Sequence, residues 1–249
     1  MIVKTIIKKI LILLIAMPAF AQASGGEVQL DHAPINLHDQ ASLQRGAKYF
    51  VNYCLNCHAA SYMRFSRLQD LGLTEQQIKD NLMFTTDKIG DTMTTALNPI
   101  DAKDWFGGVP PDLSVVSRSR GSDWLYTYLR RYYRDDTSPT GWNNEAFPNV
   151  GMPHVLQELQ GTQAMKQVGE RKGHDGKIEP ILKLVVDKPG TLNTREYDQL
   201  VADLVNYITY MGEPSRSHRT QIGVIALFFL GVLFVLALML KHEYWKDIK

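Results

Sequence analysis

Cysteine is nearly absent from this chain of 249 residues, which has only Cys54 and Cys57. Two cysteines three positions apart would close a very small ring, so a disulfide between them would be strained and would constrain little of the unfolded chain. We therefore do not expect a structural disulfide. Because both cysteines stand at one point of the sequence, they indicate a chemical role there.

An excess of charge of one sign is also missing. The chain has 27 basic and 26 acidic residues, a formal net charge of +1, which favours neither nucleic-acid binding nor the function of an acidic tail. No internal repeat or low-complexity run stands out. Acidic residues that could dock a partner are scattered and form no readable patch: Glu75, Asp80, Asp87, Asp91, Asp135 and Asp136.

Long apolar runs are missing from the middle of the chain and occur near its two ends. The first end has the parts of a secretory signal peptide: Lys4, Lys8 and Lys9, an apolar run from Ile10 to Ile15, and Ala21-Gln22-Ala23 before polar residues. This pattern predicts a signal peptide over residues 1–23 and a mature chain that starts near Ser24. An uncleaved anchor is the alternative, but the run is short for a membrane span and Pro18 interrupts it.

The second apolar run, from Ile222 to Leu240, has nineteen residues without a charge and predicts a transmembrane helix over residues 219–240. A buried core helix would need polar breaks on one face, and this segment is apolar all round. With a signal peptide in front, residues 24–218 would be exported across the membrane. The tail 241–249, with three lysines, would stay on the cytoplasmic side, although Arg216 and Arg219 on the other flank weaken the charge argument.

The exported part is expected to be one mostly α-helical domain. Four helices are predicted: residues 41–53, a helix from Thr74 to about Phe84 opened by a capping box, a helix capped by Ser122, and a helix from Asn193 through Met211 that ends before Pro214. Residues 178–186 are expected to form one arm of a small hairpin, and residues 161–176 a surface loop. Long loops at 88–116 and 137–155 would need a buried cofactor to wrap around.

Cys54, Cys57 and His58 form a Cys-x-x-Cys-His motif, which is typical of covalent haem attachment. Two thiols one helical turn apart can each form a thioether with a haem vinyl group, and the adjacent imidazole can bind the iron as proximal ligand. A redox dithiol is the competing interpretation, but the βαβ pattern expected around such a motif is missing. A zinc site would need further thiols or histidines at ligand spacing. The motif therefore predicts one covalent haem c.

The sixth iron ligand is open among several methionines and histidines. Met152 is the best candidate, because it lies in a loop where Gly151 permits close approach of the backbone and Pro153 prevents a helix. A His/Met iron favours electron transfer. Met93, Met211 and His154 remain alternatives.

Arginines near the Pro110-Pro111-Asp112-Leu113 turn are candidates to pair with the haem propionates. Arg118 and Arg120 could do so through bidentate contacts, although surface arginines are more common. Trp124 and Tyr126 either border the haem edge or are ordinary core aromatics.

Taken together, these residues resemble the cytochrome c1 family, the haem c subunits of ubiquinol–cytochrome c oxidoreductase (bc1) complexes, in its bacterial branch. The resemblance covers nearly the whole chain. It rests on the haem motif and the C-terminal span together with these segments: Trp105-Phe106, Pro110 to Ser114, Arg118 to Gly121, Asp123 to Leu125, Gly151 to Pro153 and Tyr210 to Pro214. An additional cysteine pair of some members is absent here, and residues 157–191 form an elaboration without an assigned role.

The resemblance implies a class I cytochrome c-like haem domain, residues 24–218, in the periplasm of a bacterium, on one helix that crosses the inner membrane. It implies haem attachment at Cys54 and Cys57, axial ligation by His58 and Met152, and a propionate partner at Arg120. The implied partners are the Rieske iron–sulfur protein, cytochrome b, a soluble or anchored cytochrome c and the lipid membrane, in a dimeric complex. The chain would then relay electrons and perform no bond-making catalysis itself.

Two rival functions remain at this stage. A stand-alone anchored cytochrome would carry electrons without belonging to a larger complex. An enzyme using haem catalytically would need an open sixth position on the iron, which a Met ligand would close.

Overall fold

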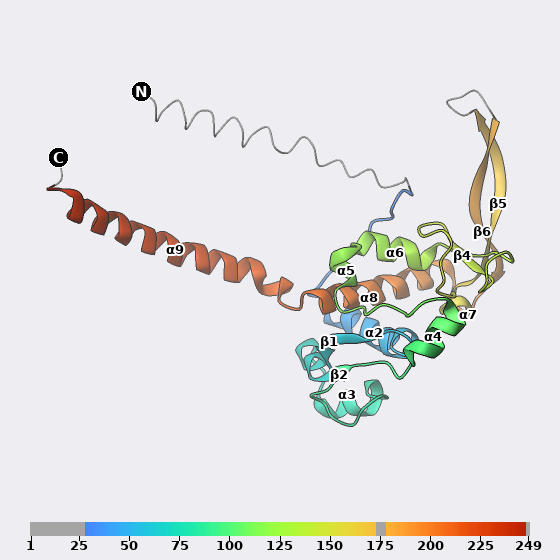
Figure 1. The fold of residues 1–249 in the computed structure, drawn as a ribbon, viewed down its shortest axis with the longest axis horizontal. Helices are drawn as coiled ribbons and strands as arrows, with labels where there is room; N and C mark the ends of the chain where they lie inside the picture. Colours follow the sequence, from blue (N-terminus) through green and yellow to red (C-terminus); the bar gives the residue numbers. More distant parts are fainter. Residues whose placement is uncertain (1–27, 173–177, 248–249) are drawn as a thin grey trace.

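The structure is a computed structural model of the chain and describes residues 28–172 and 178–247. The predicted signal peptide, residues 1–23, lies outside the described residues. Helices are the main elements, as the sequence predicts, and strands occur in three two-stranded antiparallel sheets among the described residues. Figure 1 shows a helical body from which one hairpin and one long helix project.

The centre of the body is a pair of packed helices, α2 (Gln40–Tyr49) and α8 (Thr194–Gly212) (Figure 1). Helix α8 begins with the predicted capping box, in which the Asn193 side chain accepts from the Glu196 backbone N–H and the Glu196 side chain accepts in return. Gly46 lies where the two helices meet, because a Cβ there would lie 2.1 Å from the carbonyl oxygen of Asp203. The missing side chain therefore sets how closely α2 and α8 approach.

Helices α5 (Val116–Ser119) and α6 (Ser122–Arg130) pack against α8. The prediction that Ser122 caps α6 is wrong: Gly121 is the N-cap, with a φ of 90°, and Ser122 is the first helical residue. The Ser122 hydroxyl instead forms a hydrogen bond of 2.9 Å with the hydroxyl of Thr209. A contact with α8 therefore replaces the local cap.

Shorter elements complete the body. The Thr74 capping box opens α3 (Glu75–Leu82) as predicted. The long loop at 88–116 carries a helix that the sequence analysis did not predict, α4 (Pro99–Phe106), although Asn98 and Pro99 form a typical helix start. The remaining elements are η2 (Phe50–Cys54), η3 (Phe65–Leu71), α7 (Gln157–Gln160), the strand pair β1 (Ala60–Arg64) and β2 (Thr92–Met93), and the pair β3 (Tyr132–Arg134) and β4 (Trp142–Asn144).

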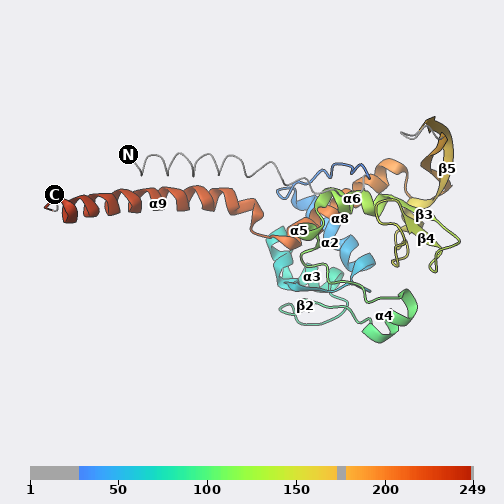
Figure 2. The ribbon, with the colours of Figure 1, turned by 45° about the horizontal axis from the view of Figure 1, so that its top comes forward.

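A long hairpin projects from the body (Figures 1 and 2). Its strands are β5 (Gly161–Lys172) and β6 (Ile178–Pro189). The predicted hairpin arm at 178–186 is confirmed, but the surface loop predicted at 161–176 is wrong over residues 161–172. Residues 161–172 are polar and glycine-containing, so they carry little strand signal of their own, and pairing with β6 supplies their backbone hydrogen bonds.

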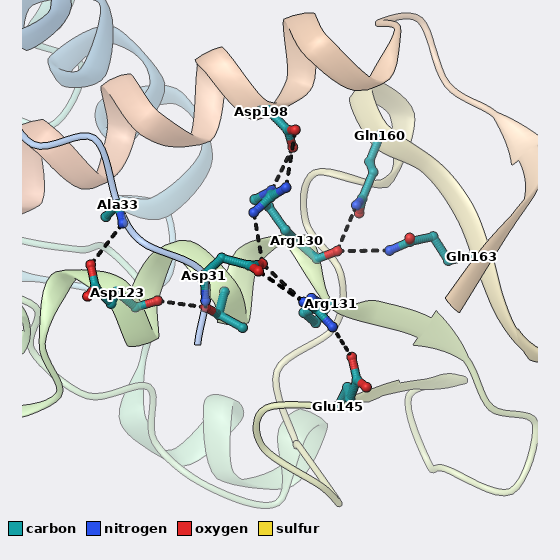
Figure 3. A network of polar contacts seen from close by, with 10 residues as sticks. Asp31, Ala33, Asp123, Arg130, Arg131, Glu145, Gln160, Gln163 and Asp198 are labelled. Atoms are coloured by element: carbon teal, nitrogen blue, oxygen red, sulfur yellow. Dashed lines mark hydrogen bonds and ion pairs between the residues drawn. The ribbon is translucent and has the colours of Figure 1, made fainter. Parts of the chain in front are cut away.

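Ion pairs fasten the first described residues to the body, and hydrogen bonds fasten the hairpin base (Figure 3). The carboxylate of Asp31 accepts hydrogen bonds from Arg130 at 2.9 Å and from Arg131 at 3.1 Å. Arg130 also binds Asp198 of α8 at 2.6 Å, and its backbone carbonyl accepts from the side chains of Gln160 and Gln163. The end of α6 is thus tied to both α8 and β5.

The last element is α9 (Arg216–Trp245), which extends away from the body (Figures 1 and 2). Among the described residues it is the one helix that is long and apolar enough to cross a membrane. Its apolar side chains are exposed along its length. This confirms the predicted C-terminal helix that could span a bilayer.

Candidate haem site

The Cys-x-x-Cys-His motif lies where α2 passes through η2 into a turn. The backbone N–H groups of Cys57 and His58 both donate to the carbonyl of Cys54, at 3.1 Å and 2.8 Å. Phe50 and Leu55 are fully buried and hold this turn against the core. The turn therefore gathers Cys54, Cys57 and His58 into one compact group.

His58 is oriented by a backbone carbonyl. Its Nδ1 lies 2.7 Å from the carbonyl oxygen of Pro111, which can only accept, so Nδ1 carries the hydrogen and Nε2 keeps its lone pair. Burial lowers the pKa of His58 and outweighs the opposing effect of this hydrogen bond. The imidazole is therefore neutral near pH 7 and can bind a metal through Nε2.

The Pro111 carbonyl is itself held in place. The Leu113 N–H donates to the carbonyl of Ala59, 2.8 Å away, and the Asp112 carboxylate accepts from the Ser61 N–H at 2.9 Å. These bonds join the Pro110–Leu113 turn to the residues that follow His58. The bond between His58 and Pro111 could not be predicted from the sequence, because no local pattern reveals a bond across 53 positions.

A cavity of about 190 Å³ lies in front of His58. Cys57, His58 and Met152 line it, together with apolar or small residues: Tyr53, Phe106, Gly108, Val109, Pro110, Pro111, Gly151, Pro153 and Val155. A thiol, an imidazole nitrogen and a thioether sulfur in an apolar pocket are the donor set of a His/Met haem c. The residues present thus fit this group, and the buried Cys54 lies on the same turn as Cys57 and His58.

Met152 reaches the cavity from a tight loop. Asn149 adopts a φ of 60°, and a Cβ on Gly151 would lie 3.0 Å from the carbonyl oxygen of Phe106, so the loop passes close to the end of α4. Of the methionines in the described residues, Met152 is the one that lines the cavity. The alternatives Met93 and Met211 are buried elsewhere in the core. Ligation by Met152 stays a prediction, but the cavity brings it together with His58.

The environment of the two thiols bears on the dithiol interpretation. Burial, together with a smaller effect of the neighbouring Cys57, raises the pKa of Cys54 to about 12, and burial also raises the pKa of Cys57. A dithiol redox site depends on a lowered thiol pKa. The site therefore lacks the electrostatics of a thiol–disulfide enzyme.

The predicted propionate partner lies outside the cavity lining. Arg120 is exposed, and its guanidinium lies 5.1 Å from the ring centre of Trp124 and 5.7 Å from that of Phe147. Arg118 is exposed as well, and Tyr126 packs under the guanidinium of Arg130. A role of Arg120 at the propionates stays a prediction.

His154, the alternative histidine ligand, lies in an apolar and aromatic surrounding. It is buried, its ring stacks on Tyr132 at 4.8 Å, and Trp142 contacts it edge-on. Burial lowers the pKa of His154 to about 4, so the ring is neutral. It is not among the residues that line the cavity, which favours Met152 over His154 as ligand.

Comparison with known proteins supports one covalent haem c. Residues 31–248 match the family described as "Cytochrome C1 family". The chain is 51% identical over 237 residues to cytochrome c1 of Allochromatium vinosum, covering 94% of this chain and 96% of the relative. It is 49% identical over 243 residues to a protein of Nitrosomonas europaea named "Ammonia monooxygenase gamma subunit", covering 97% and 98%. Cytochrome c1 of Rhodospirillum rubrum is 29% identical over 277 residues, covering 98% and 99%.

Proposed function

Because the chain belongs to the cytochrome c1 family, we propose that it relays single electrons from the Rieske iron–sulfur protein to a soluble or membrane-tethered cytochrome c. As a family member it is a haem c electron carrier of the bc1 complex. When bound, the haem supplies one-electron chemistry, and the chain holds and tunes it.

One observation carries the proposal: a single cavity presents the free Nε2 of His58 and the thioether of Met152. If both side chains ligate the iron, no coordination position is left for a substrate. Such a closed site transfers electrons and makes no bonds. Quinol chemistry would belong to a partner subunit.

The chain's own residues have separate tasks in this proposal. Cys54 and Cys57 would form the thioethers, the Pro111 carbonyl would fix the His58 ring, and the apolar lining would exclude water from the iron. Arg120 is proposed to neutralise a propionate. An apolar pocket from which water is excluded and a thioether ligand both favour a raised reduction potential.

The placement in the membrane belongs to the same proposal. Residues 24–218 would lie in the periplasm after removal of residues 1–23, with residues 219–240 crossing the inner membrane and 241–249 in the cytoplasm. The long exposed apolar helix α9 supports an anchor. Cytochrome b is the proposed neighbour within the membrane, in a dimeric complex.

The first experiment is purification of the tagged chain from gently solubilised native membranes, followed by a reduced-minus-oxidised optical spectrum. Bands of haem b and an iron–sulfur signal together with haem c are expected. A haem c band alone would favour a stand-alone carrier. Copurification of an ammonia monooxygenase would instead assign the chain to that enzyme, of which the Nitrosomonas relative is named a subunit.

The ligand set is tested by Met152→Leu. Loss of the sulfur ligand should lower the reduction potential and open the iron to carbon monoxide. Met93→Leu, at a buried methionine outside the cavity, is the matched control. An unchanged spectrum and potential in Met152→Leu would show that Met152 is not an iron ligand.

A further inference from the structure

The thioether of Met152 has a neighbour that the sequence analysis did not single out. The hydroxyl of Tyr128 lies 3.5 Å from the Met152 sulfur, within hydrogen-bond range for sulfur. The same hydroxyl lies 2.5 Å from the hydroxyl of Tyr132. Tyr128 is on the last turn of α6 and Tyr132 begins β3, so two elements converge behind the ligand loop.

The proton count favours one direction for these bonds. Each phenol has one hydrogen, and the thioether sulfur can only accept. If Tyr128 donated to Tyr132, the hydrogen of Tyr132 would be left without an acceptor, since Tyr128 is the one hydrogen-bond partner of that hydroxyl among the described residues. Tyr132 is 1% exposed, so such a loss would be costly. The favoured arrangement therefore runs from Tyr132 to Tyr128 to Met152.

The Tyr128 ring is held so that its hydroxyl stays on the sulfur. Trp124, one turn earlier on α6, stacks on it at 4.8 Å with the ring planes 12° apart. Tyr132 contacts it edge-on at 5.3 Å, and the side-chain amide of Asn144 donates to the Tyr128 carbonyl at 2.8 Å. The donor is thus fixed from three sides, whereas Met152 lies in a loop.

We propose that Tyr128 is a positioning residue for the axial sulfur, and that its hydroxyl, polarised by Tyr132, raises the reduction potential of the site. The proposal rests on Met152 as an axial ligand. A donor at the sulfur draws electron density away from it, so the sulfur stabilises the ferric state less. The ferrous state is then favoured, and the bond also restrains the ligand loop.

The test is a redox titration of the haem c band in the membrane-bound complex carrying Tyr128→Phe. We expect a lower midpoint potential than in the unmodified complex. One hydrogen bond limits the effect to about tenfold in the ratio of the two oxidation states, which is about 59 mV for one electron. Tyr126→Phe, on the same helix under Arg130, is the control and should leave the potential unchanged.

A second variant separates direct from indirect effects. Tyr132→Phe removes the polarising partner but leaves the Tyr128 hydroxyl free to donate only to sulfur, so a much smaller fall is expected. A fall equal to that of Tyr128→Phe would overturn direct donation by Tyr128. An unchanged potential in Tyr128→Phe would overturn the proposal as a whole.

Met152→Leu distinguishes this failure from failure of the ligand set. If Met152→Leu alters spectrum and potential while Tyr128→Phe does not, the role of Tyr128 is wrong and the His58/Met152 iron stands. If neither variant has an effect, Met152 is not a ligand and both proposals fall. The near-ultraviolet circular dichroism of each variant, which does not depend on the sixth ligand, reports that its haem domain has folded.

Discussion

Gly46 decides whether α2 can lie against α8, and Gly46→Ala tests this directly. In an isolated helix, alanine is more favourable than glycine by roughly 0.5–1 kcal/mol. Here the new Cβ would lie 2.1 Å from the carbonyl oxygen of Asp203 and 2.7 Å from the Cβ of Tyr207. Both obstacles are backbone or stem atoms that cannot rotate away. The two effects on stability therefore have opposite signs.

The clash should win. Ordinary contact needs more than 3.4 Å, so the helices would have to separate by about an ångström along a fully buried interface. Overpacking of this kind costs about 1–3 kcal/mol or more, which exceeds the gain in helix propensity. For a chain of this size, a net loss near 2 kcal/mol corresponds to a fall of roughly 4–8 °C in the midpoint of thermal unfolding.

The assay is the temperature at which the purified complex loses the near-ultraviolet circular dichroism of its haem domain. Gly90→Ala is the control, because a Cβ at Gly90 meets nothing within 4 Å, and it should leave the midpoint nearly unchanged. A midpoint for Gly46→Ala equal to or above that of the unmodified protein would refute the packing argument. It would mean that the helix gain outweighs the contact with α8.

Three further outcomes are expected. Arg45→Ala should lower the free energy of unfolding by about 3–5 kcal/mol, because it leaves the Asp203 carboxylate, 2% exposed, without its cation. Asp203→Ala should cost less, because the Arg45 guanidinium that it leaves is already 48% exposed, and equal losses in denaturant titrations would contradict this order. Asn193→Ala removes the capping box of α8 and should cost about 1 kcal/mol in the same titration, and no change would mean that packing alone sets the helix start. Burial alone would raise the pKa of Asp112, but hydrogen bonds from Ser114 and Ser61 outweigh burial and lower this pKa below its usual 3.8. The Asp112 carboxylate therefore stabilises the fold fully above pH 3.8, and this stabilisation is lost as the pH falls through the lowered pKa. Asp112→Asn should flatten this part of the curve of stability against pH.

The candidate site was predictable where its signal is local. Cys54, Cys57 and His58 stand together because thioether attachment and iron ligation require adjacent groups on one turn, so the motif is readable without a fold. The capping boxes at Thr74 and Asn193 and the apolar C-terminal run are local in the same sense, and the structure confirms them. By contrast, α4 was missed although Asn98 and Pro99 marked its start, and the strand at residues 161–172 was missed because its pattern is polar.

Only the tertiary structure decided the contacts between distant parts of the chain. The sequence offered several methionines, and only folding brings the 149–154 loop to His58 and buries the other candidates elsewhere. The carbonyl of Pro111 and the hydroxyl of Tyr128 reach the two predicted ligands from 53 and 24 positions away. Neither leaves a periodic or spacing signal, because a hydrogen bond depends on where two segments meet in space and not on how they follow one another along the chain.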